Sequence, residues 1–136
     1  MEPTLGAKDT ITVGFESFID SASPNNEYGV VFEDDGSTGY FYALDLKKKE
    51  NQIEDAIHIY NVEGVTDKEI PCEVHIIWSP DGQLASLIIN RYPHAVFDFK
   101  EKKTYSRSCF PDSMTDWERI PWTDEIRKHF FTKAQT

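Results

Sequence analysis

The chain has 136 residues, of which 39% are hydrophobic and 13% aromatic, and this composition suits one folded domain and excludes a disordered chain. A formal net charge of −10 argues against nucleic acid or an anionic membrane as a partner, because like charges repel. No apolar run approaches the ~20 residues that a membrane-spanning helix needs, and residues 1–9 lack the apolar stretch of a secretory signal.

The first half of the chain is expected to contain four short strands. Residues 1–9 are interpreted as a flexible tail of a single domain that spans residues 1–136. Alternating, β-branched and aromatic residues then predict strands, separated by loops rich in Ser, Asn, Asp and Gly, at residues 10–15, 28–33, 40–45 and 56–60.

The clearest pattern lies at residues 72–108, which are predicted to form three consecutive antiparallel strands. Two apolar runs, residues 72–78 and 84–90, flank a turn in which Pro80 presets the first corner and Gly82 can take a positive φ. Because both runs are apolar on both faces, this hairpin is expected in the middle of a sheet. The pattern continues with strands at residues 94–99 and 104–108.

The pattern changes after residue 111. One helical turn is expected at residues 112–117, and a short helix is expected from residue 121 to residue 131. Trp122, Ile126 and Phe130 recur every four residues and form one apolar stripe that suits packing on a sheet face. The predicted fold class is therefore α+β: mainly an antiparallel meander sheet of about eight strands, bent or forming a partial barrel, with a short C-terminal helix.

The whole chain, including residues 39–45 (GYFYALD) and 90–99 (NRYPHAVFDF), is similar to a small, functionally uncharacterised family of acidic bacterial proteins. The resemblance implies a bacterial single-domain protein and supplies no catalytic residues. Small acidic proteins of this sort are often toxin-immunity proteins, which is an analogy of class only.

Motifs for catalysis and cofactors are absent from the sequence. There is no phosphate-binding glycine loop and no HExxH metal motif. A metal site of His58, His75 and His94 would need three separate strands to converge, and isolated structural histidines are the preferred interpretation. Cys109, His94 and Asp98 contain the residue types of a thiol triad, but the Cα atoms of His94 and Asp98 on one strand would lie about 13 Å apart. We therefore expect no catalytic, cofactor or metal site. Cys72 and Cys109 lack a zinc spacing and are expected to be reduced thiols in the cytoplasm.

Acidic and aromatic residues give the favoured functional hypothesis. Residues 1–46 contain nine acidic residues and one basic residue, and Tyr40 and Tyr42 share one face of their strand beside Glu33, Asp34 and Asp35. If that face is open, it suits the Arg and Lys side chains of a partner. The alternative is that the tyrosines pack under the helix with their hydroxyls at the rim.

The sequence thus predicts a non-enzymatic, cytoplasmic binding protein that holds a basic protein, for example a toxin that it neutralises. The alternative is a small-ligand or enzymatic role in a cavity of the bent sheet around His94, Asp98 and Tyr105. An enzyme should show a deep pocket with converging polar groups, whereas a binding module should show a shallow acidic face. The sequence leaves the oligomeric state open.

Overall fold

The computed structural model of the protein describes residues 4–113 and 115–126. Within these ranges the chain forms ten β-strands and one short 3-10 helix. In chain order the elements are β1 (Thr4–Ile11), β2 (Ser17–Ala22), β3 (Tyr28–Asp34), β4 (Thr38–Asp45), β5 (Ile53–Asn61), η1 (Val62–Gly64), β6 (Cys72–Trp78), β7 (Leu84–Ile89), β8 (Tyr92–Asp98), β9 (Lys103–Ser106) and β10 (Glu118–Pro121).

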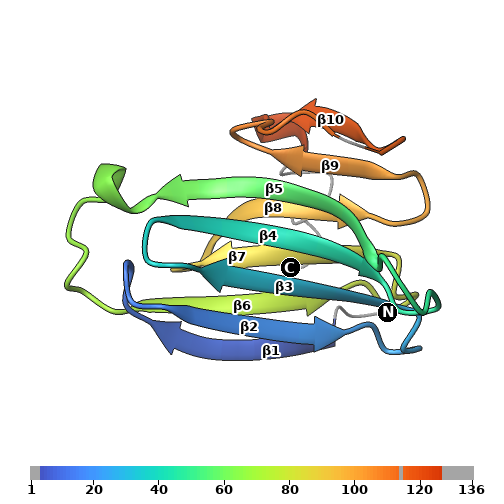
Figure 1. The fold of residues 1–136 in the computed structure, drawn as a ribbon, viewed down its shortest axis with the longest axis horizontal. Helices are drawn as coiled ribbons and strands as arrows, with labels where there is room; N and C mark the ends of the chain where they lie inside the picture. Colours follow the sequence, from blue (N-terminus) through green and yellow to red (C-terminus); the bar gives the residue numbers. More distant parts are fainter. Residues whose placement is uncertain (1–3, 114, 127–136) are drawn as a thin grey trace.

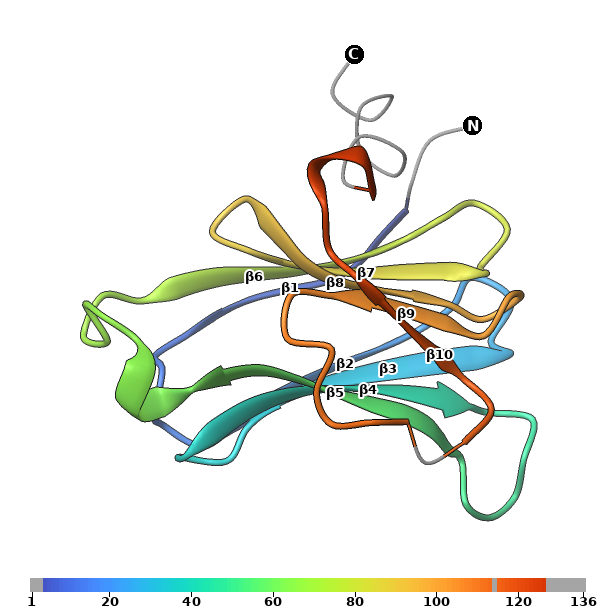
Figure 2. The same ribbon diagram turned by 90° about the horizontal axis from the view of Figure 1, so that it is seen from above.

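The strands form two sheets that pack face to face (Figures 1 and 2). A six-stranded sheet has the order β1-β6-β7-β8-β9-β10, and a four-stranded sheet has the order β2-β3-β4-β5. Every neighbouring pair is antiparallel except β9 and β10, which are parallel. The prediction of one bent meander or partial barrel was therefore wrong, because the chain builds two separate layers. The mostly antiparallel character of the sheets is confirmed.

The core lies between the two layers and is rich in aromatic rings. Phe41 of the four-stranded sheet stacks on Phe97 of the six-stranded sheet, with ring centroids 4.7 Å apart. Trp117 meets Phe97 edge-on at 5.9 Å and Phe99 at 5.5 Å. Trp78 is fully buried and stacks on Phe99. Alternation along each strand puts these rings on the inner faces, which leaves the outer faces to other residues.

The predicted hairpin is confirmed. The N–H of Gly82 donates to the carbonyl of Ser79 at 2.9 Å, and Gly82 has a φ of +72°. β6 and β7 occupy the second and third places in the six-stranded sheet, so the hairpin lies inside the sheet as predicted. β6 to β9 follow one another as antiparallel neighbours, and β8 and β9 correspond to the strands predicted at residues 94–99 and 104–108. The predicted total of three strands for residues 72–108 was therefore one too few.

The N-terminal prediction was wrong in three places. Residues 4–9 belong to β1 rather than to a flexible tail, because β1 pairs with the free edge of β6; residues 1–3 lie outside the described part. The strand predicted at residues 10–15 is a turn from residue 12 onward, where the N–H of Phe15 donates to the carbonyl of Thr12 and Gly14 has a φ of +91°. β2 occupies residues 17–22, where no strand was predicted.

The C-terminal prediction is only partly open to comparison. Residues 124–126 are helical, and the Oγ1 of Thr123 accepts the N–H of Ile126 at 3.2 Å. Trp122 and Ile126 are half-buried, while Phe130 and the rest of the expected helix lie outside the described residues. The helical turn expected at residues 112–117 is replaced by bends and irregular backbone at the described positions. β10 follows it and pairs with β9, and the described residues are mostly β-strand rather than α+β.

Candidate functional site

The outer face of the four-stranded sheet carries a cluster of aromatic side chains. Phe41 points into the core and is fully buried, so its neighbours Tyr40 and Tyr42 point outward, as the sequence predicted. Their rings stack with centroids 6.1 Å apart. The ring of His58 on β5 meets the ring of Tyr40 edge-on at 5.5 Å. The tyrosines therefore lie on an outer sheet face.

Strand register extends this cluster into a row across all four strands. Phe18 on β2 lies opposite Glu33 on β3, Glu33 lies opposite Tyr40, and Tyr40 lies opposite His58. Directly opposed residues project from the same face of a sheet. Phe18 is 69% exposed at one end of the row.

A loop after β9 completes the row at the other end. Phe110 is 57% exposed, and its ring meets the ring of His58 edge-on at 5.9 Å. We refer to Phe18, Glu33, Tyr40, Tyr42, His58 and Phe110 as the acidic–aromatic face. It joins strands from residue 18 to residue 58 with a loop about 50 residues further along the chain.

Backbone and side-chain hydrogen bonds hold that loop in place. The N–H of His58 donates to the carbonyl of Phe110 at 2.7 Å, and the hydroxyl of Ser108 donates to the carbonyl of His58 at 2.8 Å. The loop thus occupies hydrogen-bonding groups on the otherwise open edge of β5.

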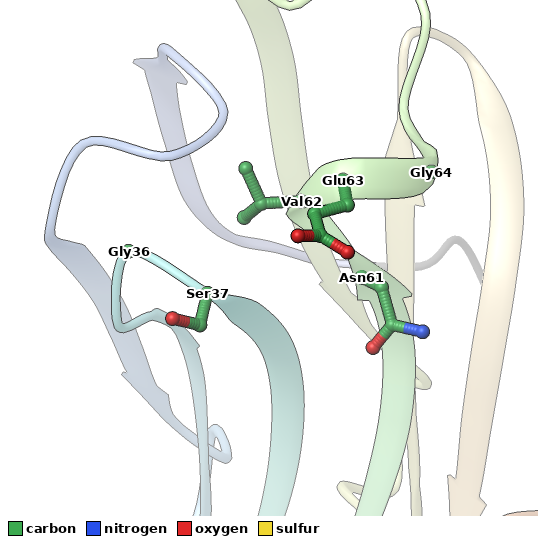
Figure 3. A pocket seen from close by; sticks show the side chains of 6 residues that line it. All are labelled: Gly36, Ser37, Asn61, Val62, Glu63 and Gly64. Carbon is green, nitrogen blue, oxygen red and sulfur yellow. The ribbon is translucent and has the colours of Figure 1, made fainter.

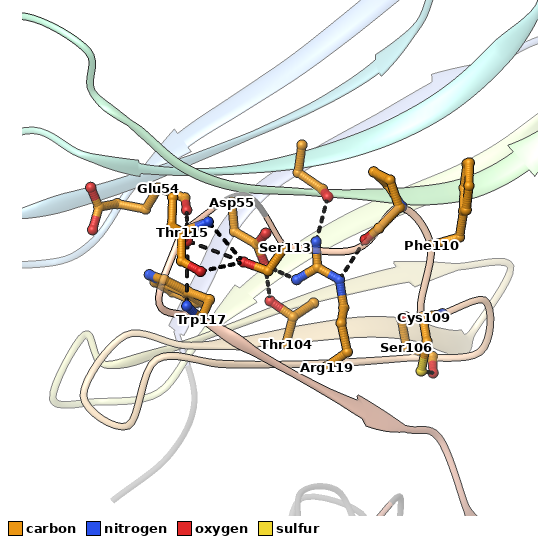
Figure 4. Close-up of polar contacts among 12 residues, drawn as sticks. Glu54, Asp55, Thr104, Ser106, Cys109, Phe110, Ser113, Thr115, Trp117 and Arg119 are labelled. Atoms are coloured by element: carbon orange, nitrogen blue, oxygen red, sulfur yellow. Dashed lines mark hydrogen bonds and ion pairs between the residues drawn. The ribbon is translucent and has the colours of Figure 1, made fainter.

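A buried ion pair lies beneath the same loop (Figure 4). The Nη1 of Arg119 on β10 lies 2.5 Å from the Oδ2 of Asp55 on β5, and that oxygen also accepts the hydroxyl of Thr104 on β9. The Nε of Arg119 donates to the carbonyl of Pro111 at 2.9 Å, and its Nη2 donates to the carbonyl of Ala56 at 3.1 Å. Arg119 therefore ties the edge of one sheet to the edge of the other and to the loop that carries Phe110.

Charge on the four-stranded sheet has one sign. Its strands contain six acidic residues and no Lys or Arg: Asp20, Glu33, Asp34, Asp45, Glu54 and Asp55. Lys48, from the turn after β4, forms an ion pair with Glu54 at 2.6 Å. Glu33 is exposed, and the hydroxyl of Tyr42 donates to its Oε1 at 3.4 Å. Burial and the neighbouring Glu33 raise the pKa of Tyr42, which keeps the phenol protonated.

The structure separates the three acidic residues that the sequence grouped together. Asp34 points inward and is 1% exposed, and its carboxylate accepts the N–H groups of Gly14 and Gly36 at 2.8 Å and the hydroxyl of Tyr60 at 2.7 Å. It is therefore part of the fold and not of an exposed surface, as strand alternation requires beside the outward Glu33. Asp35 is exposed in the turn, where the backbone N–H groups of Thr38 and Ser37 lower the pKa of its carboxyl.

A hollow of about 600 Å³ lies at the end of the acidic–aromatic face, between the β3–β4 turn and η1 (Figure 3). Ser37, Asn61 and Glu63 supply its polar side chains. The Oδ1 of Asn61 lies 2.9 Å from the Nε2 of His58, which connects the hollow to the aromatic row. The hollow is partly open to solvent, and it presents acceptor oxygens that suit a cationic group.

The residues of the alternative cavity do not converge. His94 lines a pocket at one end of the sandwich, and neither Asp98 nor Tyr105 lines that pocket. Asp98 lies at the far end of β8, where its carboxylate accepts the N–H groups of Lys100 and Glu101. Tyr105 lies on β9 opposite Val96. The structure therefore does not bring these three residues together around the pocket that His94 lines. Among residues 4–113 and 115–126, no group of three or more His, Cys, Asp or Glu could hold a metal ion.

Sequence analysis missed Phe18, His58 and Phe110 as members of the face. Phe18 and His58 are found once the register of β2 to β5 is known, since both lie in the row of Glu33 and Tyr40. No local signal points to Phe110, because its position depends on the hydrogen bonds to β5.

Comparison with known proteins gives a family but no activity. Residues 11–131 match the model of a family described as uncharacterised proteins conserved in bacteria, DUF2251. The chain belongs to this family. An uncharacterised protein of Haemophilus influenzae is 44% identical to the chain over 100 residues, and this region is 72% of the chain and 62% of that relative. No solved structure matches.

The matched stretch includes every residue of the acidic–aromatic face. The family resemblance drawn from residues 39–45 and 90–99 is thereby confirmed. In the part of the chain that the structure covers, no helix is long and apolar enough to cross a membrane.

Proposed function

We propose that this DUF2251 protein is a non-enzymatic, cytoplasmic binding protein that holds a basic protein on its acidic–aromatic face. The observation that carries the proposal is the row of Phe18, Glu33, Tyr40, His58 and Phe110 on a sheet whose strands contain acidic residues and no Lys or Arg. Neutralisation of a basic toxin is one concrete form of the proposal.

The chemistry of the face suits the side chains of Arg and Lys. A guanidinium group can stack on the half-buried, outward-facing rings of Tyr40 and Tyr42 and donate to the carboxylate of Glu33. Phe18 and Phe110 at the two ends can exclude water around that contact, which strengthens it. The hollow beside Asn61 and Glu63 gives a second place for a cationic group.

The test uses a hexaarginine peptide as the probe. We expect it to shift the backbone NMR signals of β4 and β5 at about 50 mM salt and to lose most of its affinity at about 500 mM, because screening weakens charge–charge attraction. The Glu33→Lys variant should bind the peptide roughly 5–10-fold more weakly, since one favourable charge contact becomes repulsive. Asp34 is unsuitable for such a reversal, because its carboxylate is buried and hydrogen-bonded.

The matched control is Glu73→Lys, which makes the same charge change at an exposed position on the six-stranded sheet. Both variants should keep the wild-type melting temperature, since exposed single charges contribute little to folding. Equal losses of affinity in the two variants would show that the net charge of the protein, and not the acidic–aromatic face, attracts the peptide. A hexaglutamate peptide that bound as well as hexaarginine would contradict the proposal directly. Once peptide binding to the face is established, the wild type and Glu33→Lys can be used side by side to capture proteins from a bacterial lysate. The partner is the protein that the wild type captures and Glu33→Lys does not.

A further inference from the structure

A second pocket, of about 510 Å³, opens at the end of the sandwich where the β5–β6 connection meets the β7–β8 turn. Figure 1 shows η1 and the connection that follows it at this end. Val13, Ile70 and Ile89 form apolar walls, and Tyr60 and Tyr92 add aromatic ones. A pocket of this size with mostly apolar walls and few polar groups has the character of a small-molecule site.

A β-bulge places one polar group in this pocket. Leu87 on β7 lies opposite Ala95 on β8, and the next residue, Ile88, lies opposite Pro93. His94 therefore has no partner residue across the ladder, and its ring lines the pocket instead. Bulges redirect a side chain in this way beside many binding sites.

The ring nitrogens of His94 are available to a ligand. In the described part of the chain His94 forms no hydrogen bond, and its ring contact is with Tyr92, edge-on with centroids 5.8 Å apart. Burial, assisted by the positive charge of Arg107, lowers the pKa of His94 to about 4, so the imidazole is neutral at pH 7. A neutral imidazole offers one donor and one acceptor.

The remaining polar groups of the pocket limit the charge of the ligand. The hydroxyl of Tyr60 is already bound to Asp34, so its ring and not its hydroxyl serves the pocket. Asp67 is an exposed residue of the pocket lining, and the chain as a whole carries a net charge of −10. Both negative charges disfavour an anionic ligand, because like charges repel. A cationic ligand would lose its hydration against the apolar walls, which costs free energy.

We propose that this pocket binds a small, uncharged aromatic molecule that carries one hydroxyl or N–H group, with that group hydrogen-bonded to His94. The aromatic ring packs between Tyr92 and the aliphatic walls, and the polar group replaces the water that would otherwise solvate the imidazole. The site shares no residue with the acidic–aromatic face, so it stands independently of the proposed partner.

The test compares three probes of the same shape: 4-methylphenol, toluene and 4-methylbenzoate. NMR titration should show saturable shifts at residues around Ile70 and His94, with 4-methylphenol binding roughly 5–10-fold more tightly than toluene because of one additional hydrogen bond. The His94→Phe variant keeps an aromatic ring but has no ring nitrogen. It should reduce 4-methylphenol to the affinity of toluene while the affinity of toluene itself stays the same.

A matched pair of exposed isoleucines keeps the test informative if His94→Phe folds poorly. Ile70 lines the pocket and Ile53 lies on β5 away from it, with exposures of 58% and 57%. Ile70→Ala should weaken both neutral probes, and Ile53→Ala should weaken neither.

Three results would overturn the proposal. They are equal affinity of 4-methylphenol and toluene for the wild type, tighter binding of 4-methylbenzoate, and shifts that map away from Ile70 and His94. Glu33→Lys should leave 4-methylphenol binding unchanged, which separates failure of this site from failure of the acidic–aromatic face.

Discussion

The strands of the four-stranded sheet contain six acidic residues and no Lys or Arg, whereas the strands of the six-stranded sheet contain four acidic and three basic residues. Their outer faces differ as well. Val96 and Ser86 lie outside the core cluster on the six-stranded sheet and are still buried. On the four-stranded sheet Phe18 projects into solvent. One core thus supports two unlike surfaces, and the exposed, single-sign one is the better candidate for a charged partner.

The inner and outer faces of the four-stranded sheet should differ most under truncation. Phe41→Ala removes a fully buried ring that stacks across the core and should lower the free energy of unfolding by about 3–5 kcal/mol. Phe18→Ala removes an exposed ring and should change it by less than about 0.5 kcal/mol. Urea unfolding measures both. A large loss in Phe18→Ala would mean that this ring serves the fold and not a partner.

Arg119 tests whether the two sheets are joined at their edges. Arg119→Ala leaves the buried carboxylate of Asp55 without its cation and should cost about 3 kcal/mol. The loop that carries Phe110 should exchange its amide hydrogens faster in this variant, because Arg119 also binds the carbonyl of Pro111. Amide exchange at β3, in the interior of the four-stranded sheet, serves as the reference. Unchanged amide exchange in the loop would show that the backbone hydrogen bonds to β5 are sufficient to hold Phe110 without Arg119.

The pocket end of the six-stranded sheet should respond to acid through His94. Its pKa is lowered from 6.5 to about 4 in the folded protein, so the unfolded chain takes up a proton that the folded chain resists. Stability is therefore fully present above pH 6.5 and is lost as the pH falls from 6.5 to 4. At a half-buried site the loss attributable to His94 should be about 1–3 kcal/mol.

The measurement for His94 is urea unfolding of wild type and His94→Gln at pH 7 and pH 4. Carboxylates titrate in both proteins, so only the difference between them reports on His94. If both proteins lost the same free energy of unfolding between pH 7 and pH 4, the imidazole of His94 would be solvated in the folded protein. The pocket would then lack the neutral hydrogen-bonding group that the proposed ligand needs.

The hairpin of the six-stranded sheet touches the four-stranded sheet at the opposite end. A Cβ on Gly82 would lie 3.2 Å from the Oδ1 of Asn25 and 3.3 Å from the Cβ of Ser23, in addition to the strain of a φ of +72°. Gly82→Val should therefore cost about 1–2 kcal/mol. Gly64→Val, at a glycine with no atom within 4 Å of an added Cβ, should cost clearly less. Thermal unfolding of the two variants side by side makes the comparison, and equal costs would argue against the cross-sheet contact.

Local patterns predicted those features that depend on neighbours in the chain. The alternation around Phe41 placed Tyr40 and Tyr42 on one face, and Pro80 with Gly82 placed a hairpin turn, because period-two alternation and turn dihedrals are properties of a few consecutive residues. The same alternation, followed one residue further from Glu33, would have placed Asp34 inside. Charge counting along residues 1–46 concealed this, since it treats buried and exposed carboxylates alike.

The sequence by itself determined most strands, the central hairpin, the family and the outward face of Tyr40 and Tyr42. Only the tertiary structure decided that there are two sheets, that β1 pairs with β6, and that Phe110 meets His58. It also brought Arg119 to Asp55, 64 residues apart in the chain. These outcomes depend on which strand edges pair and on which charged side chains must be paired once they are buried. Such contacts join residues far apart in the sequence, so no periodic sequence pattern predicts them.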